Sequence, residues 1–415
     1  MRNARMLLRA LGVERAMIED VQWREGAAQA LHVQVGLTKR EQRRCPHCGR
    51  RCPLYDRGHG LRKWRAPDLG LSPVYVLTRA PRVRCAEHGV CVQRVPWARH
   101  GSGFTRAFED RVAWLAVRTD KTTLSSLLNV AWRTVGKILE RVSQSMRTTQ
   151  DPLASVTRIG VDEVSYRKGY RFLTIVVDHD TGRLLWASPG KDEATLGRFF
   201  DELGPERSAR IRVVSADASP SFRNVLRERC PQATVCLDPF HVVQWATKAL
   251  DAVRRSVWND LRRSGQKERA KSLQGARWAL WKNYGDLSAA QHVTLANIER
   301  DNQPLFRAYL LKEELRSIFQ DPDKTLAKHT LDDWLGWASR SRLAPFIKLA
   351  QSIRAHRQAI HDVLDHGLSN ARLEAAATKL RLLTRLAFGF HSHTPLVALA
   401  MLKLGGLCPP LPARP

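Results

Sequence analysis

The sequence has few cysteines and no long apolar run, and each of these absences excludes a class of protein. It also has fewer acidic than basic residues. Eight cysteines in 415 residues are too few for a disulfide scaffold. The longest apolar run, residues 395–402, is far shorter than the roughly 18 residues that a membrane-spanning helix needs. Arg9 and Arg15 interrupt the apolar stretches near Met1, which argues against a secretory signal. Five of the eight cysteines cluster in one short region, which suggests a metal in a reducing cytosol, so we expect a cytoplasmic protein.

The composition that remains indicates a folded protein with a large positive charge. Hydrophobic residues make up 43% of the chain and charged residues 26%, which is enough to form a core and excludes disorder for most of it. Lys and Arg number 68 against 40 Asp and Glu, so the formal net charge is +28. An excess of this size indicates a polyanionic partner, nucleic acid before membrane.

Five of the eight cysteines lie in one short region, where their spacing predicts a metal site. Cys45 and Cys48 form a C-x2-C knuckle, and Cys85 and His88 form a second pair at the same spacing. Thiolates and imidazoles in this pattern are typical ligands of a zinc ribbon, so we predict a structural Zn2+ held by these four residues. Cys91 is an alternative to His88 as fourth ligand, and a group of buried free cysteines is the alternative to a metal site. Several arginines around the cluster would suit phosphate contacts or form a solvated basic face: Arg43, Arg44, Arg50, Arg51, Arg57, Arg62 and Arg65.

Apolar residues at helical spacing predict two short helices on either side of Asn129-Val130-Ala131, as in a helix-turn-helix. The apolar positions are Leu124, Leu127, Leu128, Val135, Ile138, Leu139 and Val142. Thr122 or Thr123 could cap the first helix. The predicted DNA contacts on the second helix, which would enter a major groove, are Arg133, Thr134, Lys137 and Arg141. An ordinary helical hairpin gives almost the same pattern, but the charge and the neighbouring ribbon favour DNA binding.

Runs rich in β-branched residues predict a mixed sheet after residue 156. Two earlier runs, residues 30–37 and 72–79, also predict strands, and the later five are residues 157–164, 170–177, 183–187, 211–215 and 234–237. Tight turns join the first three of these five, which favours an antiparallel meander. Helical stretches at residues 192–203 and 219–229 precede the last two and favour parallel crossovers. After Phe240 the pattern is helical almost to the end, so we predict a multidomain α/β plus α protein with an appended or inserted helical subdomain.

Two aspartates occupy unusual positions in this predicted sheet. Asp162 lies in a run that otherwise reads as a buried strand, where an acid is costly unless it is paired or binds a metal. Asp217 ends the fourth strand, at the edge where α/β sheets place their sites. Asp217 could alternatively cap the next helix, a role for which Ser219 competes.

Several blocks of sequence, in order, resemble the ISL-three family of DDE transposases from bacterial insertion sequences. The blocks are Gly160-Val161-Asp162-Glu163, Ser215-Ala216-Asp217, Asp238-Pro239-Phe240-His241-Val242, Ser369-Asn370-Ala371-Arg372-Leu373-Glu374 and Ala387-Phe388-Gly389-Phe390. The order of ribbon, helix-turn-helix and catalytic domain is also similar, so the resemblance covers nearly the whole chain. After the closing glutamate the family's pattern usually has a glycine and, three residues on, an asparagine, whereas Ala375 and Ala377 stand here.

The resemblance implies an RNase H-like core in which Asp162, Asp217 and Glu374 bind two Mg2+ (or Mn2+) ions. His241 would touch the scissile phosphate, or else cap or pack the helix that begins there. Arg381 and Arg385 share a helix face with Glu374 and are predicted DNA contacts. The implied domains are residues 1–103 (zinc ribbon), 104–150 (helix-turn-helix), 151–240 (core, first part), 241–365 (helical insertion) and 366–415 (core, final helices).

The implied activity is that of a DNA transposase, which binds the terminal inverted repeats of its element, cleaves DNA and joins the freed end to a target. Its partner would be double-stranded DNA, with a homodimer or larger assembly on the DNA and no membrane. Its location would be the bacterial cytoplasm, on the nucleoid. Two alternatives stay open: a catalytically inactive DNA-binding regulator derived from such an enzyme, and a nuclease of the same fold without strand transfer.

Overall fold

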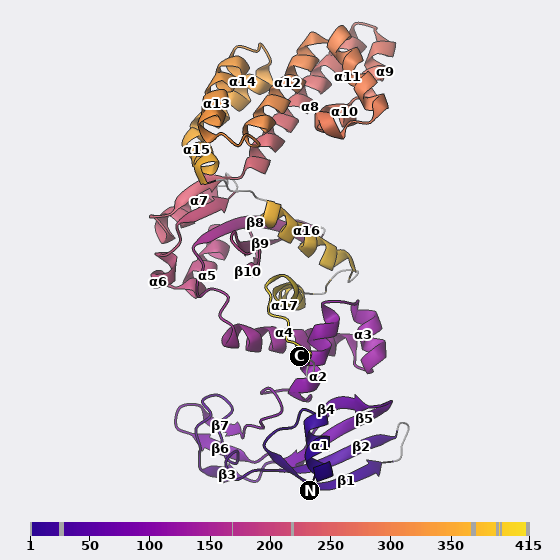
Figure 1. The fold of residues 1–415 in the computed structure, drawn as a ribbon, viewed down its shortest axis with the longest axis vertical. Helices are drawn as coiled ribbons and strands as arrows, with labels where there is room; N and C mark the ends of the chain where they lie inside the picture. Colours follow the sequence, from indigo (N-terminus) through magenta and orange to yellow (C-terminus); the bar gives the residue numbers. More distant parts are fainter. Residues whose placement is uncertain are drawn as a thin grey trace. The chain divides into compact units, whose positions relative to one another are not determined.

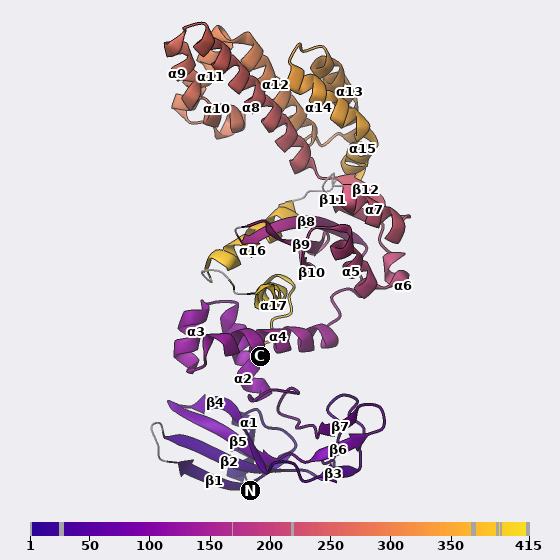
Figure 2. The same ribbon diagram turned by 180° about the vertical axis from the view of Figure 1, so that it is seen from behind.

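The computed structural model describes residues 2–24, 29–167, 169–216, 220–366, 371–386, 390 and 392–411 (Figures 1 and 2). The chain divides into two compact units, one of Met1–Asp151 with Leu383–Pro415 and the other of Pro152–Leu382. The first unit therefore combines residues from both ends of the chain. None of the helices in the described ranges contains a stretch long and apolar enough to cross a membrane.

A four-stranded sheet forms the beginning of the first unit. Its strands are ordered β1-β2-β5-β4, with bounds β1 (Ala16–Arg24), β2 (Ala30–Leu37), β5 (Ser72–Arg79) and β4 (Leu61–Leu69). β2 and β5 have the predicted bounds, because Val33 and Val35 on β2 and Val74 and Val76 on β5 alternate into one core. Helix α1 (Arg2–Ala10) adds Leu8 to that core.

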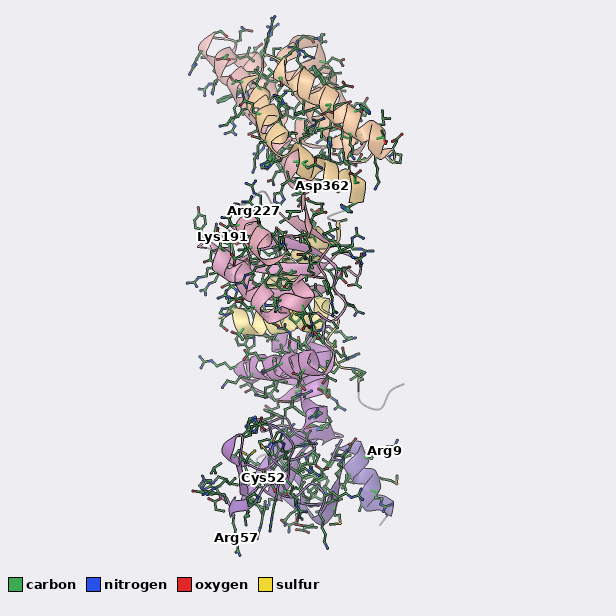
Figure 3. The ribbon with its side chains drawn as sticks, turned by 90° about the vertical axis from the view of Figure 1, so that its left-hand side faces the viewer. Arg9, Cys52, Arg57, Lys191, Arg227 and Asp362 are labelled. Atoms are coloured by element: carbon green, nitrogen blue, oxygen red, sulfur yellow. The ribbon has the colours of Figure 1, made fainter. Side chains whose placement is uncertain are left out.

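A three-stranded sheet in the same unit carries the clustered cysteines. β6 (Arg82–Cys85) lies between β3 (Leu54–Asp56) and β7 (Gly89–Val92). Figure 3 labels Cys52 and Arg57 on this part of the chain. With three or four residues each, these strands are too short for an alternating pattern to reveal them, and the sequence did not predict them.

Three helices, α2 (Arg106–Ala116), α3 (Lys121–Leu128) and α4 (Trp132–Thr149), confirm the predicted helix-turn-helix. The turn passes through Asn129, whose φ of 48° is left-handed, a conformation that asparagine adopts more readily than most residues. The cap of α3 is Asp120, whose side chain accepts hydrogen bonds from the backbone N–H groups of Thr122 and Thr123. The prediction that one of these threonines is the cap was therefore wrong.

The last helix, α17 (His393–Leu404), packs against α4 within the first unit (Figure 1). Gly136 of α4 permits this close approach, since a Cβ at that position would lie 3.3 Å from Cγ of Pro395. Leu396, Leu399 and Leu402 of α17 are buried. The predicted domain of residues 366–415 joined this helix to the catalytic core, whereas the structure groups it with the helix-turn-helix.

The second unit contains a five-stranded mixed sheet ordered β10-β9-β8-β11-β12. Its strands are β8 (Arg158–Arg167), β9 (Arg171–Asp178), β10 (Leu184–Pro189), β11 (Val213–Ala216) and β12 (Thr234–Leu237). β8, β9 and β10 form an antiparallel meander, β11 runs parallel to β8, and β12 runs parallel to β11. The intervening helices are α5 (Glu193–Leu203), α6 (Pro205–Ser208) and α7 (Pro220–Arg229). The five predicted strands and their directions are confirmed.

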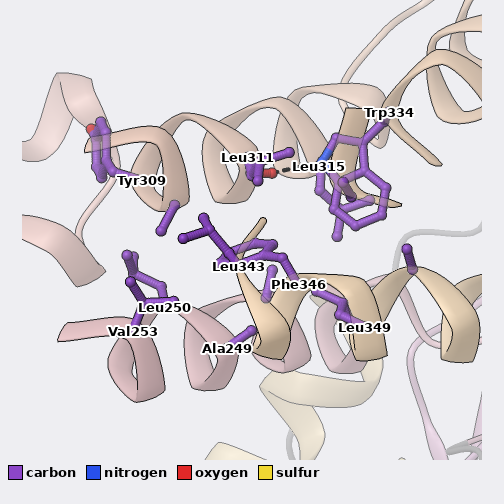
Figure 4. Close-up of a cluster of buried hydrophobic side chains, with 14 of the residues drawn as sticks. Ala249, Leu250, Val253, Tyr309, Leu311, Leu315, Trp334, Leu343, Phe346 and Leu349 are labelled. Carbon is purple, nitrogen blue, oxygen red and sulfur yellow. Dashed lines mark hydrogen bonds between the residues drawn. The ribbon is translucent and has the colours of Figure 1, made fainter. Parts of the chain in front are cut away.

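From β12 to His366 the described chain is helical, as predicted, and α16 (Ala371–Leu386) follows. The elements are α8 (Pro239–Arg263), α9 (Lys267–Gly275), α10 (Arg277–Trp281), a 3-10 turn (Tyr284–Asp286), α11 (Ala289–Asp301), α12 (Gln303–Ile318), α13 (Lys324–Ser339), α14 (Ala344–Ala355) and α15 (Arg357–His366). Leu250, Leu311 and Phe346 meet in a core of their own, where Trp334 Nε1 donates to the carbonyl oxygen of Leu311 at 2.8 Å (Figure 4).

Candidate active site and metal centre

The predicted zinc ligands converge at the three-stranded sheet. Cys45 and Cys48 come from the first knuckle, Cys85 ends β6, and His88 lies in the turn before β7. The one ligand atom that each residue offers lies within 4.8 Å of the other three.

The distances within this group fit zinc. Cys48 Sγ lies 3.7 Å from Cys85 Sγ, and His88 Nδ1 lies 3.6 Å from Cys85 Sγ and 3.8 Å from Cys45 Sγ. A tetrahedral ion with Zn–S near 2.3 Å and Zn–N near 2.0 Å would place two sulfurs roughly 3.8 Å apart and sulfur and nitrogen roughly 3.5 Å apart. The chain therefore has a zinc ribbon with a structural Zn2+ site.

His88, rather than Cys91, belongs to the four-residue group. The hydrogen bond with His88 lowers the pKa of the Cys85 thiol to about 6, which favours the thiolate that zinc needs. Burial raises the pKa of the Cys91 thiol to about 11. Cys91 Sγ lies 3.9 Å from Cys45 Sγ and belongs to the lining of the site.

The predicted DNA contacts on α4 have different environments. Arg133 and Lys137 are exposed, and Thr134 is half-buried. Arg141 differs from these residues because it is paired with an acid: its Nε and Nη2 donate to Glu109 Oε1 at 2.8 and 2.7 Å. Glu109 is fully buried, and Arg141, which was expected to be exposed, is half-buried and paired with it. Its guanidinium neutralises a buried carboxylate instead.

The sheet register brings acidic side chains to one edge of the second unit. Gly160 of β8 pairs with Ser215 of β11, and Ser215 pairs with Cys236 of β12. Two residues beyond this row lie Asp162 on β8 and Asp238 at the end of β12. Residues two apart on a strand face the same side, so both aspartates belong to the face that Gly160 occupies. Asp217, which follows β11 along the chain, lies outside the described residues.

Asp162 is surrounded by ionisable groups from three elements. Burial raises its pKa, and a backbone hydrogen bond from Glu163 opposes that rise. His241 of α8 and Arg381 of α16 also lower the pKa of Asp162, whereas the carboxylate of Asp238 raises it. Asp238 is buried and accepts a hydrogen bond from His241 Nδ1 at 2.9 Å. Asp162, Asp238, His241 and Arg381 are thus close enough to interact electrostatically.

Helix α16 begins beside this group. Arg372 Nη1 donates to the carbonyl oxygens of His179 and Asp180, which fastens the first turn of α16 to the β9–β10 turn. A Cβ on Gly160 would lie 3.2 Å from Cδ2 of Leu373, so glycine at this position favours the close approach of the helix to β8. Glu374 follows Leu373 and is exposed.

Asp238 is the residue that the sequence argument did not assign. It also accepts a hydrogen bond from the backbone N–H of Phe240 at 2.8 Å and is the N-cap of α8. An acid that precedes proline after a short apolar strand was the available signal, because proline favours the first position of a helix. Arg381 lies near Asp162, and Arg385 is exposed further along α16.

Comparisons with known proteins agree with this arrangement along the whole chain. A family model described as a transposase matches residues 159–399. Residues 93–143 match the helix-turn-helix domain of transposase family ISL3, and residues 41–91 match the zinc-finger of transposase IS204/IS1001/IS1096/IS1165.

Two curated proteins are similar over nearly their full lengths. The transposase for insertion sequence element IS1557 of Mycobacterium tuberculosis is 49% identical over 437 aligned residues, which cover 100% of this chain and 98% of the relative. The transposase for insertion sequence element IS1001 of Bordetella parapertussis is 26% identical, with 91% of this chain and 92% of the relative covered. These matches place the chain among the transposases, which are enzymes that act on DNA. Within that class it belongs to family ISL3.

Proposed function

We propose that Asp162, Asp217 and Glu374 are the acids of a DDE active site that cuts and joins DNA. The observation that supports this most is the convergence of Asp162, Asp238, His241 and Arg381 at one edge of the sheet. Asp217 stands two residues after Ser215 in the sequence, the same step that separates Asp162 from Gly160. An antiparallel meander followed by two parallel strands supports an RNase H-like core, with α8–α15 as an insertion before the third acid.

The residues present fit a divalent cation. Asp162 offers hard carboxylate oxygens in a partly buried position where burial disfavours its charge, and a bound cation would offset that cost. Two Mg2+ or Mn2+ ions, when bound, would polarise the phosphate and activate the attacking oxygen. In the first step, water would hydrolyse a phosphodiester at the element's end and free a 3′-hydroxyl. In the second step, this 3′-hydroxyl would attack a phosphodiester of the target DNA and expel a 3′-hydroxyl of the target strand.

His241 and Arg381 would orient the DNA for these steps. Asp238 fixes the imidazole of His241 through Nδ1, so a contact with the scissile phosphate would be made through Nε2. Arg381, which lies near Asp162, would hold a neighbouring phosphate. Arg385 would contact a phosphate further along the same DNA strand.

The helix-turn-helix would bind the terminal inverted repeats of the element through Arg133, Thr134 and Lys137. We place this domain at residues 104–150, after a ribbon domain of residues 1–103, and the core at residues 151–240 and from residue 366. The working form would be a homodimer or larger assembly on double-stranded DNA, in the cytoplasm and on the nucleoid.

The alternative of an inactive regulator draws on Ala375 and Ala377, where the family's pattern differs. Ala377 is buried in the structure, on the same side of α16 as Leu373 and Leu380. It is therefore a packing residue, and its identity gives no reason for lost catalysis.

Metal-dependent nicking of a duplex that carries the element's end tests the proposal. Wild-type protein should nick it and then join the cut end to a second duplex. Asp217→Ala and Asp162→Asn should each reduce nicking at least about 100-fold, because each removes a charged group that acts in the transition state. Asp201→Ala, which removes an exposed carboxylate of α5, is the matched control and should leave the rate unchanged.

The other outcomes separate the alternatives. Binding of the duplex without cleavage by the wild-type protein would identify a regulator. Cleavage whose ends never join would identify a nuclease.

A further inference from the structure

A basic cavity lies within the first unit, between the zinc ribbon and α4. Its volume is about 690 Å³, and its walls come from the first zinc knuckle, from β4, from residues 92–106 and from the second half of α4. The zinc ribbon and the helix-turn-helix therefore share one hollow surface. The predicted active site does not account for this cavity, although Arg62 and Arg141 of its lining are among the arginines that the sequence predicts for DNA or phosphate contacts.

The charged side chains that line the cavity are all basic. Five arginines line it and no carboxylate does: Arg62, Arg94, Arg99, Arg106 and Arg141. His47 and His100 add two imidazoles, with ring centroids 4.8 Å apart. A surface of this kind attracts an anion.

Two of the five arginines are neutralised by buried acids behind the wall. Arg99 Nη1 and Nη2 lie 3.2 Å from Glu109 and 2.7 Å from Asp110, and Arg141 binds Glu109 as well. Within the described ranges Arg94 has one acidic partner, Glu41, at 4.0 Å.

Arg62 and Arg106 have no ion pair within 4.0 Å in the described part of the chain, so the cavity keeps surplus positive charge. Arg62 lies over the ring of Trp64, with its Cζ 5.9 Å from the ring centroid. Burial lowers the pKa of Arg106, and repulsion from Arg99 and Arg94 lowers it further, while Asp110 and Glu109 oppose this shift. An anion placed among these guanidinium groups would relieve the repulsion.

One neutral group of the wall also suits phosphate. Ser145 supplies a hydroxyl group, which commonly contacts phosphate oxygens in DNA complexes. The hydroxyls of Ser102, Thr148 and Thr149 instead donate to Glu109 and to the carbonyl oxygens of Gln144 and Ser145. Gln144 and Thr148 lie 7 and 11 residues after Lys137 on one face of α4, so the exposed basic face of the helix leads into the cavity. From Arg133 to Thr148 this face is about 22 Å long, which is enough to follow several phosphates of one strand.

We propose that this cavity binds backbone phosphates of the DNA duplex that α4 engages, through Arg62 and Arg106. This inference rests on the proposed DNA-binding role of the helix-turn-helix. The zinc ribbon then has a second role, because it forms one wall of a phosphate site as well as folding around its metal. The duplex would be fixed at two places, base edges at the start of α4 and the backbone at its end.

The dependence of DNA affinity on salt tests the proposal with the full-length, zinc-loaded protein. Fluorescence anisotropy would measure the Kd for a 40-base-pair duplex of mixed sequence between roughly 50 and 200 mM salt, since each lost phosphate contact lowers the log–log slope by about 0.9. Arg62→Ala with Arg106→Ala should reduce the slope by about 2, and each single change by about 1. Arg106→Lys should keep most of the slope because it keeps the charge.

Arg9→Ala is the matched control, because it removes the same charge from the same unit. Figure 3 shows Arg9 on the opposite side of this part of the chain from Cys52 and Arg57, and Arg9 does not line the cavity. The control should leave the slope unchanged, and circular dichroism with zinc content would show that every variant is folded.

A double variant that has the slope of the control would overturn the proposal. Tighter DNA binding by the double variant would overturn it too, because the cavity would then hold an acidic protein segment that competes with DNA. Failure of the wild-type protein to bind any duplex would instead contradict the proposed function, and loss of nicking with normal binding would concern the active site alone.

Discussion

Lys121 connects the helix-turn-helix with the C-terminal part of the chain through side-chain contacts. It is the first residue of α3 and only 4% exposed. Its ammonium lies 4.4 Å from the ring centroid of Trp132 and 4.2 Å from that of Phe390, a residue of the resembled closing block. Cation–π contacts of this kind stabilise a desolvated ammonium only in part. Burial accordingly lowers the pKa of Lys121 to about 8, and Glu140 opposes the shift.

The stability of the first unit should therefore depend on pH through Lys121. Between about pH 8 and 10.5 the unfolded chain binds a proton on this residue that the folded protein has released, so the free energy of unfolding rises with pH. A shift from 10.5 to about 8 corresponds to a gain of up to roughly 3 kcal/mol across this window. Lys121→Met, which fills the same space without a charge, should lack that gain.

Urea unfolding followed by circular dichroism at pH 7, 9 and 10.5 would measure the difference between the two proteins. The difference should move in favour of wild type as the pH rises. A constant difference would show that Lys121 keeps its ordinary pKa in the fold.

Residue environments were the part of the structure that sequence could predict least. Arg141 is 32 positions from Glu109, and nothing near either residue indicates their contact. The cap of α3 was missed for a more local reason: Asp120 stands one position before the helix, and Thr122 and Thr123 resemble caps but donate to it. Asp162 was found because an acid inside an apolar strand is anomalous without any knowledge of its partners.

At the scale of elements, the two knuckles of the zinc ribbon depend on each other, because both supply ligands to the same metal site. Cys85→Ser should lose the bound zinc and unfold the three-stranded sheet, because a small closed site supplies much of the stability of such a domain. Cys91→Ser should keep one zinc per chain, since His88 completes the group. Zinc content by mass spectrometry, with proteolysis of residues 41–91, would compare the two variants.

A loss of zinc in Cys91→Ser, with retention in a His88→Ala variant, would reverse this assignment of the fourth ligand. Chelation of the metal from wild-type protein should reproduce the behaviour of Cys85→Ser.

Strands could be predicted where the burial of one face makes apolar residues recur at a regular spacing in the sequence. β2, β5 and the five strands of the second unit have enough β-branched residues for the pattern to appear. β3, β6 and β7 follow from zinc ligation and from pairing with each other rather than from a local pattern. The register that brings Asp238 level with Asp162 is likewise a property of the paired strands, because it depends on where β12 lies in the sheet.

At the scale of the whole molecule, a C-terminal segment of the chain packs in the same unit as the N-terminal segments. α17 packs against α4 and α2, so the helix-turn-helix is completed by residues from the opposite end of the sequence. The family resemblance implied that residues 366–415 belong to the catalytic core, because the closing glutamate and the closing block lie in or near this segment. A unit built this way requires the complete chain before its DNA-binding helix is fully packed.

Removal of residues 387–415 should therefore destabilise the helix-turn-helix and spare the second unit. Leu396, Leu399 and Leu402 are buried, and exposing an apolar side chain of this size costs about 1.5–3 kcal/mol each. Leu402→Asp in the full chain should have a weaker effect of the same kind, and Lys403→Ala, which changes an exposed residue of the same helix, should have none. Hydrogen exchange measured by mass spectrometry would show faster exchange in α2, α3 and α4, and unchanged exchange in β8 and β9. Equal protection of α4 in the shortened and complete chains would mean that α2, α3 and α4 are stable without α17 and would contradict this prediction.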